Sequence, residues 1–116
     1  MKNKQVINKG DIILIPFPFS DLSNSKLRPS LVLGIDASDV SVVFITSNVE
    51  DKSHTVSIIP SETNGIKSKS YIRYSKMASL DIKMSVGKLG KLETEIYDKV
   101  VDNIYKFIKW HAIIKA

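Results

Sequence analysis

The spacing of hydrophobic positions changes once along the chain, near residue 90. Before that point, short runs rich in β-branched residues are separated by polar turn residues, which is the pattern of β-strands. After Gly90, apolar residues recur every three or four positions, which is the pattern of an amphipathic helix. The chain therefore predicts several short strands followed by a single helix.

Five strands are predicted, and all of them fall within residues 11–75. Ile12–Phe17 is apolar at nearly every position, so we expect it to be buried on both faces, in the middle of a small sheet or barrel. Asp36–Asp39 holds turn-forming residues between two β-branched runs and predicts a hairpin. The five predicted strands are Ile12–Phe17, Leu31–Ile35, Val40–Thr46, His54–Ile59 and Ser70–Tyr74.

Two prolines, Pro16 and Pro18, mark the place where the first predicted strand leaves the sheet, because proline donates no hydrogen bond to a ladder. The polar segment that follows ends at Arg28-Pro29 and is longer than the usual connection of about 4 to 6 residues. Longer connections tend to be functional or disordered. We therefore expect a loop that holds the Arg28 side chain in a fixed place at its end.

The predicted helix covers about residues 94–110. Acidic residues near its start and lysines near its end complement the helix dipole. Its apolar residues are expected to form one continuous stripe: Ile96, Val100, Val101, Ile104, Phe107 and Ile108. Together with the strands, this predicts a single α+β domain over residues 1–116, in which the helix covers a curled antiparallel sheet.

The composition excludes several kinds of site and segment. The chain has no cysteine, which excludes disulfides and thiolate metal sites. Its N-terminal sequence, MKNKQVINKGD, lacks the apolar core of a signal peptide. No apolar run approaches the roughly 18 residues of a membrane-spanning helix. We therefore expect a soluble intracellular protein.

Positive charge is concentrated in one part of the chain, although the net charge is only +5. The segment from Lys67 to Lys91 has seven basic residues and one acid, a net charge of +6, while the remaining 10 basic and 11 acidic residues give −1. A basic segment in a neutral body indicates a polyanion or an acidic protein as partner. The alternative, a solvated lysine-rich loop, is equally compatible with the charge.

Nucleotide and metal motifs are missing from the sequence. It has no P-loop, no GxGxxG motif and no cluster of metal-binding side chains. The two histidines, His54 and His111, lie in different predicted elements, so an acid–base histidine pair is the weaker hypothesis. The candidates for chemistry are therefore arginines and hydroxyl groups.

Three places combine those groups: Arg28 at the loop end, Thr46-Ser47 at a strand end, and Arg73 in the basic segment. Arginine binds phosphate oxygens bidentately, and strand-end hydroxyls and N–H groups can stabilise charge that develops on a phosphate. In RNA the neighbouring 2′-OH can attack that phosphate, so that no metal or protein nucleophile is required. Alternatively, the arginines are solvated and the Thr-Ser pair caps a turn.

Three blocks of the sequence resemble, in order, the MazF/PemK family of toxin endoribonucleases. The first comprises the GDI-plus-apolar strand at Gly10–Ile15, the PFPFSDL segment and LRPSLVL from Leu27 to Leu33. The second is the strand that ends in Thr46-Ser47, and the third is Ser70–Leu92. A lone Arg-Pro would mean little, whereas three blocks in register are specific.

The resemblance implies a fold, an activity and partners. The fold would be an SH3-like small antiparallel β-barrel with a C-terminal amphipathic helix. The activity would be sequence-selective cleavage of single-stranded RNA without a metal or cofactor, leaving a 2′,3′-cyclic phosphate and a 5′-hydroxyl. The partners would be RNA, a second copy in a homodimer, and a cognate antitoxin whose C-terminal segment occupies the RNA groove. The protein would be cytoplasmic, with no membrane contact.

By position, the resemblance also implies site residues. The catalytic candidates are Arg28, Thr46, Ser47 and Arg73, and the RNA-binding candidates are Ser20, Asn24, Lys26, Ser75 and Lys76. Pro18–Leu27 would be a flap at the groove. Some relatives have an aspartate two residues after the second arginine, and here that position is Ser75; a later basic position is Ala78. Ser75 and Ala78 favour the alternative of a weak or inactive module that binds RNA or antitoxin. The same scaffold also permits a gyrase-directed toxin, for which the sequence has no positive indication.

Overall fold

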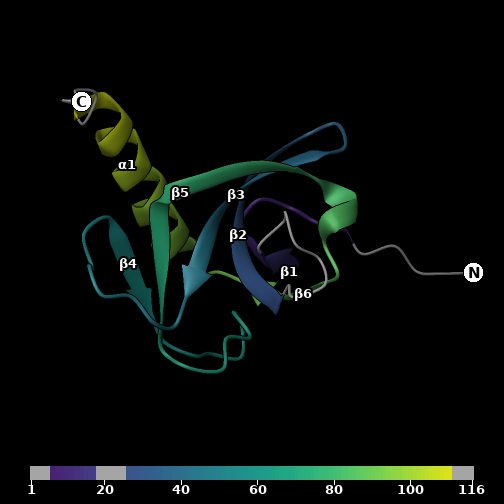
Figure 1. The fold of residues 1–116 in the computed structure, drawn as a ribbon, viewed down its shortest axis with the longest axis horizontal. Coiled ribbons are helices and arrows are strands. Elements are labelled where there is room, and N and C mark those ends of the chain that lie inside the picture. Colours follow the sequence, from purple (N-terminus) through teal and green to yellow (C-terminus); the bar gives the residue numbers. More distant parts are fainter. Residues whose placement is uncertain (1–5, 18–25, 111–116) are drawn as a thin grey trace, which may run out of the picture.

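The computed structural model describes residues 6–17 and 26–110, and these form one curled antiparallel sheet with a helix packed against it (Figure 1). The elements in chain order are β1 (Asp11–Phe17), β2 (Lys26–Asp36), β3 (Asp39–Thr46), β4 (Thr55–Ile58), β5 (Ser70–Asp81), a 3-10 helix (Ile82–Met84), β6 (Gly87–Lys91) and α1 (Thr94–Trp110). The order across the six-stranded sheet is β4-β5-β3-β2-β1-β6. The predicted run of strands followed by one helix is confirmed.

The sheet extends beyond the predicted strand limit of residue 75. Strand β5 continues to Asp81, and β6 was not predicted at all. The β6 sequence, GKLGK, has two glycines and two lysines, so it has neither the composition nor the apolar alternation of a strand. It becomes a strand because it pairs with β1, as in the pair Asp11 and Lys91. The prediction of strands only within residues 11–75 was therefore wrong.

Strand β1 is buried on both faces, as its apolar sequence predicts. Ile12 belongs to the core between the sheet and α1, together with Val100 of the helix. Ile13 and Ile15 belong to a second apolar cluster on the opposite face, which includes Val32 of β2. Successive side chains of a strand point to opposite faces, so two separate clusters account for a continuous apolar run.

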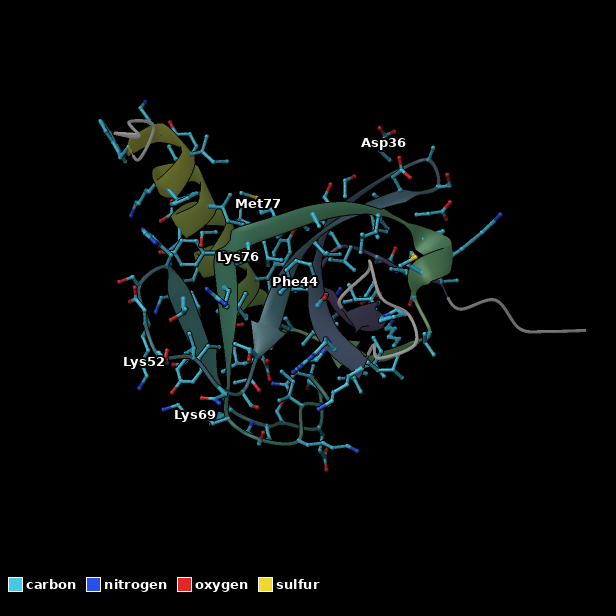
Figure 2. The ribbon with its side chains drawn as sticks, viewed as in Figure 1. Asp36, Phe44, Lys52, Lys69, Lys76 and Met77 are labelled. Carbon is cyan, nitrogen blue, oxygen red and sulfur yellow. The ribbon has the colours of Figure 1, made fainter. Side chains whose placement is uncertain are left out.

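A bulge in β5 bends the sheet next to the middle of β3. Val43 is paired with Met77, whereas the next residue of β3, Phe44, is paired with Arg73. The intervening residues 74–76 of β5 therefore have no counterparts on β3. Extra residues of this kind bend a strand and increase its twist. Figure 1 shows β5 changing direction sharply, and Figure 2 shows Lys76 and Met77 at this bend, above Phe44.

Helix α1 has the predicted bounds, but its apolar stripe is divided between two environments. Val100 and Ile104 pack on the sheet, and Phe107 lies edge-on against the rings of His54 and Tyr74. Val101 and Ile108 are exposed, at 41% and 59% of their surface. The predicted stripe is thus only partly buried. Val101 lies about 100° around the helix from Val100, and the end of the helix extends past the sheet (Figure 1). Across the described part of the chain, no helix has the length and apolarity needed to span a membrane.

Candidate functional site

Arg28 lies inside strand β2 and not at the end of a loop. Its pairing partner on β1 is Ile15, and the ladder continues to Leu27 opposite Pro16. Proline is tolerated there because β6 pairs with β1 only as far as Leu14 and Gly87, so Pro16 has no neighbour that needs its missing N–H. The sheet thus fixes the backbone of Arg28 more firmly than the predicted loop end would.

Two hollows adjoin Arg28 on the surface of the sheet. The first, with a volume of about 300 Å³, is lined by Leu14, Leu27, Arg28, Pro29, Ile45, Thr46, Ser47, Ile66, Lys67, Ser68, Ser70 and Leu89. The second, of about 430 Å³, is lined by Arg28, Phe44, Ile45, Thr46, Arg73 and Lys76. The residues common to both are Arg28, Ile45 and Thr46. We call the two hollows together the groove.

The structure brings most of the predicted site residues to this groove. The first hollow contains Ser47, and the second contains Arg73 and Lys76. Ser75 lies in the β5 bulge and lines neither hollow, and Lys26 is exposed at the start of β2, outside the lining of both. Ser20, Asn24 and most of the predicted flap lie outside the described residues.

The Thr46 side chain has a structural role as well as a place in the groove. Its hydroxyl accepts a hydrogen bond from the N–H of Asn48, at 3.2 Å, and donates to the carbonyl of Asn48, at 3.1 Å. These bonds form the turn after β3, which is the alternative that the sequence left open for the Thr-Ser pair. The same side chain lines both hollows, so the turn positions the hydroxyl beside Arg28.

Sequence reasoning missed one wall of the first hollow, the segment that carries Ile66, Lys67 and Ser68. The segment is held by Asn64, whose amide oxygen accepts from the N–H groups of Ser61 and Ile66 at 3.1 and 2.9 Å. The Asn64 amide nitrogen donates to the carbonyl of Ile59, at 3.0 Å. The sequence Asn64-Gly65 is typical of a turn, but no local pattern indicates where that turn docks.

The same segment is tied to the start of α1 through Glu93. One carboxylate oxygen of Glu93 accepts from the Ser61 hydroxyl at 2.6 Å, and the other accepts from Asn64 at 3.3 Å. The bond from Ser61 is the main reason why the pKa of Glu93 lies below 4.5, its ordinary value, although burial acts in the opposite direction. The Glu93 carboxylate is therefore charged when it holds this wall in place.

Two glycines allow this wall to contact β6 closely. A Cβ on Gly65 would lie 2.2 Å from the carbonyl oxygen of Leu89, and Gly65 also has a φ of +71°. A Cβ on Gly90 would lie 2.4 Å from the carbonyl oxygen of Thr63. Both positions therefore require glycine, because the backbones are too close for any side chain.

The electrostatic character of the groove is set by its cations. Lys67 contributes to the first hollow, Arg73 and Lys76 to the second, and Arg28 to both. Within residues 6–17 and 26–110, no group of three or more histidine and acidic side chains is arranged to hold a metal ion. His54 lies against the rings of Tyr74 and Phe107 and lines neither hollow. The groove can therefore bind a phosphate through arginine, lysine and hydroxyl groups.

A comparison with known protein families identifies the family of this chain. Residues 8–108 match the model of a family described as PemK-like, MazF-like toxin of type II toxin-antitoxin system. The chain belongs to this toxin family. The match spans all three sequence blocks that resembled MazF and PemK proteins, and that resemblance is confirmed. No curated protein sequence matches the chain.

Solved structures of MazF proteins share the fold. The toxin in the MazE–MazF complex (Form-II) from Deinococcus radiodurans has a TM-score of 0.75 at 17% identity, over 92% of this chain and 99% of that one. The Mycobacterium tuberculosis toxin MazF-mt6 has a TM-score of 0.69 at 17% identity, over 85% and 96%. An endoribonuclease in complex with its cognate antitoxin, from a mycobacterial species, has a TM-score of 0.71 at 14% identity, over 90% and 97%. The predicted MazF-like fold, a curled antiparallel sheet with a C-terminal helix, is confirmed.

Proposed function

We propose that this chain is the toxin of a toxin–antitoxin pair and cleaves single-stranded RNA without a metal ion. The observation that carries the proposal is the position of Arg28, a strand residue beside Thr46 at the junction of two adjoining hollows. A phosphate at this junction would have nucleotides on both sides of it, one over each hollow. Membership of the toxin family and the cations of the groove support the same function.

The proposed reaction uses the RNA itself as the nucleophile. The 2′-oxygen attacks the neighbouring phosphorus and gives up its proton, the bond from phosphorus to the 5′-oxygen breaks, and that oxygen takes a proton. The products are a 2′,3′-cyclic phosphate and a 5′-hydroxyl. Arg28 binds the phosphate oxygens and is the candidate acid for the leaving oxygen. Ser47 donates to the developing charge, and the Thr46 O–H does so when it turns from the carbonyl of Asn48 to the phosphate. Arginine is unsuited to act as the base, because its guanidinium group remains protonated in proteins.

Arg73 is proposed as a second cation in this site. It lines the second hollow, where it would attract the phosphate of the neighbouring nucleotide. The residue two positions later, Ser75, carries no carboxylate and lines neither hollow, so we propose no acid–base pair between positions 73 and 75. Lys76 adds charge to the same hollow.

Incubation of the purified protein with mixed-sequence single-stranded RNA in EDTA tests the proposal. We expect fragments whose 5′-hydroxyl ends accept phosphate from a polynucleotide kinase, and we expect none from Arg28→Ala. Lys106→Ala is the matched control, because Lys106 is an exposed cation on α1. Absence of cleavage by the unmodified protein, or full cleavage by Arg28→Ala, would contradict the proposal.

A second candidate function is a binding module that holds RNA or antitoxin without cutting RNA. The feature that favours it is Ser75, which stands where the family resemblance implies an aspartate in some relatives. Salt-sensitive RNA binding without a 2′,3′-cyclic phosphate product would support this function. A change in DNA supercoiling by gyrase on addition of the protein would instead indicate a gyrase-directed toxin.

We also propose that a homodimer forms in the cytoplasm and that an antitoxin segment occupies the groove. The positive charge of the groove favours an acidic segment. Light scattering after size-exclusion chromatography would measure the mass of the assembly. Competition between RNA and a co-expressed acidic partner would show whether the two share the groove.

A further inference from the structure

Tyr71 on β5 lies beside the groove, although it lines neither hollow. It is paired with Thr46 of β3 on one side and with Ser57 of β4 on the other. Side chains directly opposite each other in antiparallel strands lie on the same face, with Cβ atoms about 4.5–5.5 Å apart. The Tyr71 side chain is therefore a direct neighbour of Thr46, which lines both hollows.

The groove and Tyr71 belong to one continuous face of the sheet. Arg73 stands two residues after Tyr71 on β5, so the alternation of a strand places both side chains on the same face. Arg73 is paired with Phe44, and both of these residues line the second hollow. An RNA strand that passes over Arg73 and Thr46 would therefore meet Tyr71 next.

Two lysines flank the Tyr71 ring. The ammonium nitrogen of Lys52 lies 5.3 Å from the ring centroid, and that of Lys69 lies 5.8 Å from it. Lys52 comes from the turn before β4 and Lys69 from the segment before β5, and Figure 2 shows both beside these two strands. Both lysines are exposed and the tyrosine is partly exposed, so the three side chains are accessible from solvent.

The cation–π contacts do not prevent a base from binding to the Tyr71 ring, because a base stacks on tyrosine more strongly than an exposed lysine interacts with it. A base can therefore displace a lysine from the ring, and the displaced ammonium group is then available to a phosphate. Two acids, Glu50 and Asp51, precede Lys52 in the same turn. Asp51 is engaged there, since its carboxylate accepts a 2.9 Å hydrogen bond from the N–H of Ser53. These acids limit the positive surface on the β4 side.

We propose that Tyr71, with Lys52 and Lys69, is a stacking platform for a base of the single-stranded RNA that occupies the groove. The inference rests on the proposed RNA-directed function. Sites for single strands combine aromatic rings that stack bases with cations that follow the backbone, and this cluster has both. The competing explanation is that the cluster only stabilises the edge of the sheet, in which case RNA affinity would not depend on the ring.

Binding of a fluorescein-labelled, fully 2′-O-methylated, mixed-sequence single-stranded RNA tests the platform, because this probe has no 2′-OH and cannot be cleaved. Measured by fluorescence anisotropy, Tyr71→Leu is expected to bind about tenfold more weakly, and Tyr71→Phe within about twofold of the unmodified protein. The matched control is Tyr105→Leu, since Tyr105 is an exposed tyrosine on α1 with Lys109 at 5.6 Å from its ring. That control is expected to bind normally.

The lysines provide a second measurement that does not depend on the tyrosine variants. The double variant Lys52→Gln, Lys69→Gln should reduce the slope of log affinity against log salt by about 0.7 for each RNA phosphate that a lysine no longer neutralises. Both residues are exposed, so the variant should fold even if Tyr71→Leu does not. An unchanged slope, unchanged affinity of Tyr71→Leu, or equal weakening by Tyr71→Phe and Tyr71→Leu would overturn the platform.

The outcomes separate this inference from the proposed nuclease function. Cleavage of natural RNA together with normal probe binding by Tyr71→Leu would overturn the platform and leave the nuclease proposal standing. Probe binding that depends on the Tyr71 ring, without cleavage of natural RNA, would support the platform and overturn the nuclease. Failure of the unmodified protein to bind the probe at all would overturn the platform, while cleavage of natural RNA would still decide the nuclease proposal.

Discussion

Arg28 of β2 and Thr46 of β3 line the same two hollows. The two strands are paired through Ser30 and Phe44, and continuation of that antiparallel register by two residues brings Arg28 level with Thr46. A cation and a hydroxyl are thus held side by side by two neighbouring strands. Neighbouring strands thus place both groups beside a bound phosphate, although the Thr46 O–H has to turn from the carbonyl of Asn48 to donate to it.

We predict that Arg28→Ala reduces the rate of RNA cleavage more than Arg73→Ala does. Arg28 lines both hollows, whereas Arg73 lines only the second. Loss of a preorganised donor to the reacting phosphate costs about 10²–10³-fold in rate, and loss of a charged hydrogen bond to a neighbouring phosphate about tenfold. Single-turnover cleavage rates of the two variants measure the difference, and equal or reversed losses would assign the main chemistry to Arg73.

Thr46→Val is predicted to lose both activity and stability, because the hydroxyl lines the groove and also forms the turn to Asn48. The stability loss should be about 1 kcal/mol in chemical denaturation. Thr46→Ser retains the hydroxyl and should keep most of the activity. Ser85→Ala is the matched control: it removes a similar local hydroxyl bond, to the carbonyl of Gly87, outside the groove. Activity of Thr46→Val equal to that of Ser85→Ala would show that the hydroxyl serves the turn alone.

Acid is predicted to weaken the wall formed by Ile66, Lys67 and Ser68. The pKa of Glu93 is lowered in the folded protein, first by the hydrogen bond from Ser61, so its contribution to stability is present above the ordinary pKa of 4.5. That contribution is lost as the pH falls through the lowered pKa. Unfolding by urea between pH 3 and pH 8 should thus show a decline below about pH 4.5 that is smaller in Glu93→Gln.

The matched control for this pH dependence is Glu62→Gln, which removes an exposed carboxylate from the same segment. Its pH profile should follow that of the unmodified protein. If Glu93→Gln shows the full acid-dependent decline, the carboxylate of Glu93 does not hold the wall through its charge.

Replacement of Ser30 by alanine is predicted to preserve or raise stability. The Ser30 side chain is fully buried, and its hydroxyl has no hydrogen-bond partner among the residues that the structure describes. A buried unpaired hydroxyl costs about 1–3 kcal/mol, so its removal should increase the free energy of unfolding by about 1 kcal/mol. Ser41→Ala, at an exposed position of β3, should have little effect. A loss of stability in Ser30→Ala beyond that of Ser41→Ala would contradict the prediction.

The local sequence pattern was enough to predict the elements that depend mainly on their own residues. Helix α1 was predicted with its bounds because its apolar and charged residues repeat at the helical period. The hairpin around Asp36–Asp39 was predicted because turn residues separate two β-branched runs, and its Ala37 has the positive φ of a tight turn. The family was predicted because three sequence blocks occur in order.

The places where the side chains of the groove meet depend on the tertiary structure. Strand β6 forms because it pairs with β1. Pairing with β1 also makes Arg28 part of β2, so that it does not lie at the end of a loop. The wall at Lys67 depends on Glu93, and Tyr71 becomes a neighbour of Thr46 through pairing between β3 and β5. The helix and most strands could thus be predicted, since they follow from local periodicity, and the candidate chemical groups could be named from residue types. The sequence by itself did not determine the groove, because pairing register, bulges and loop docking depend on contacts between residues far apart in the chain.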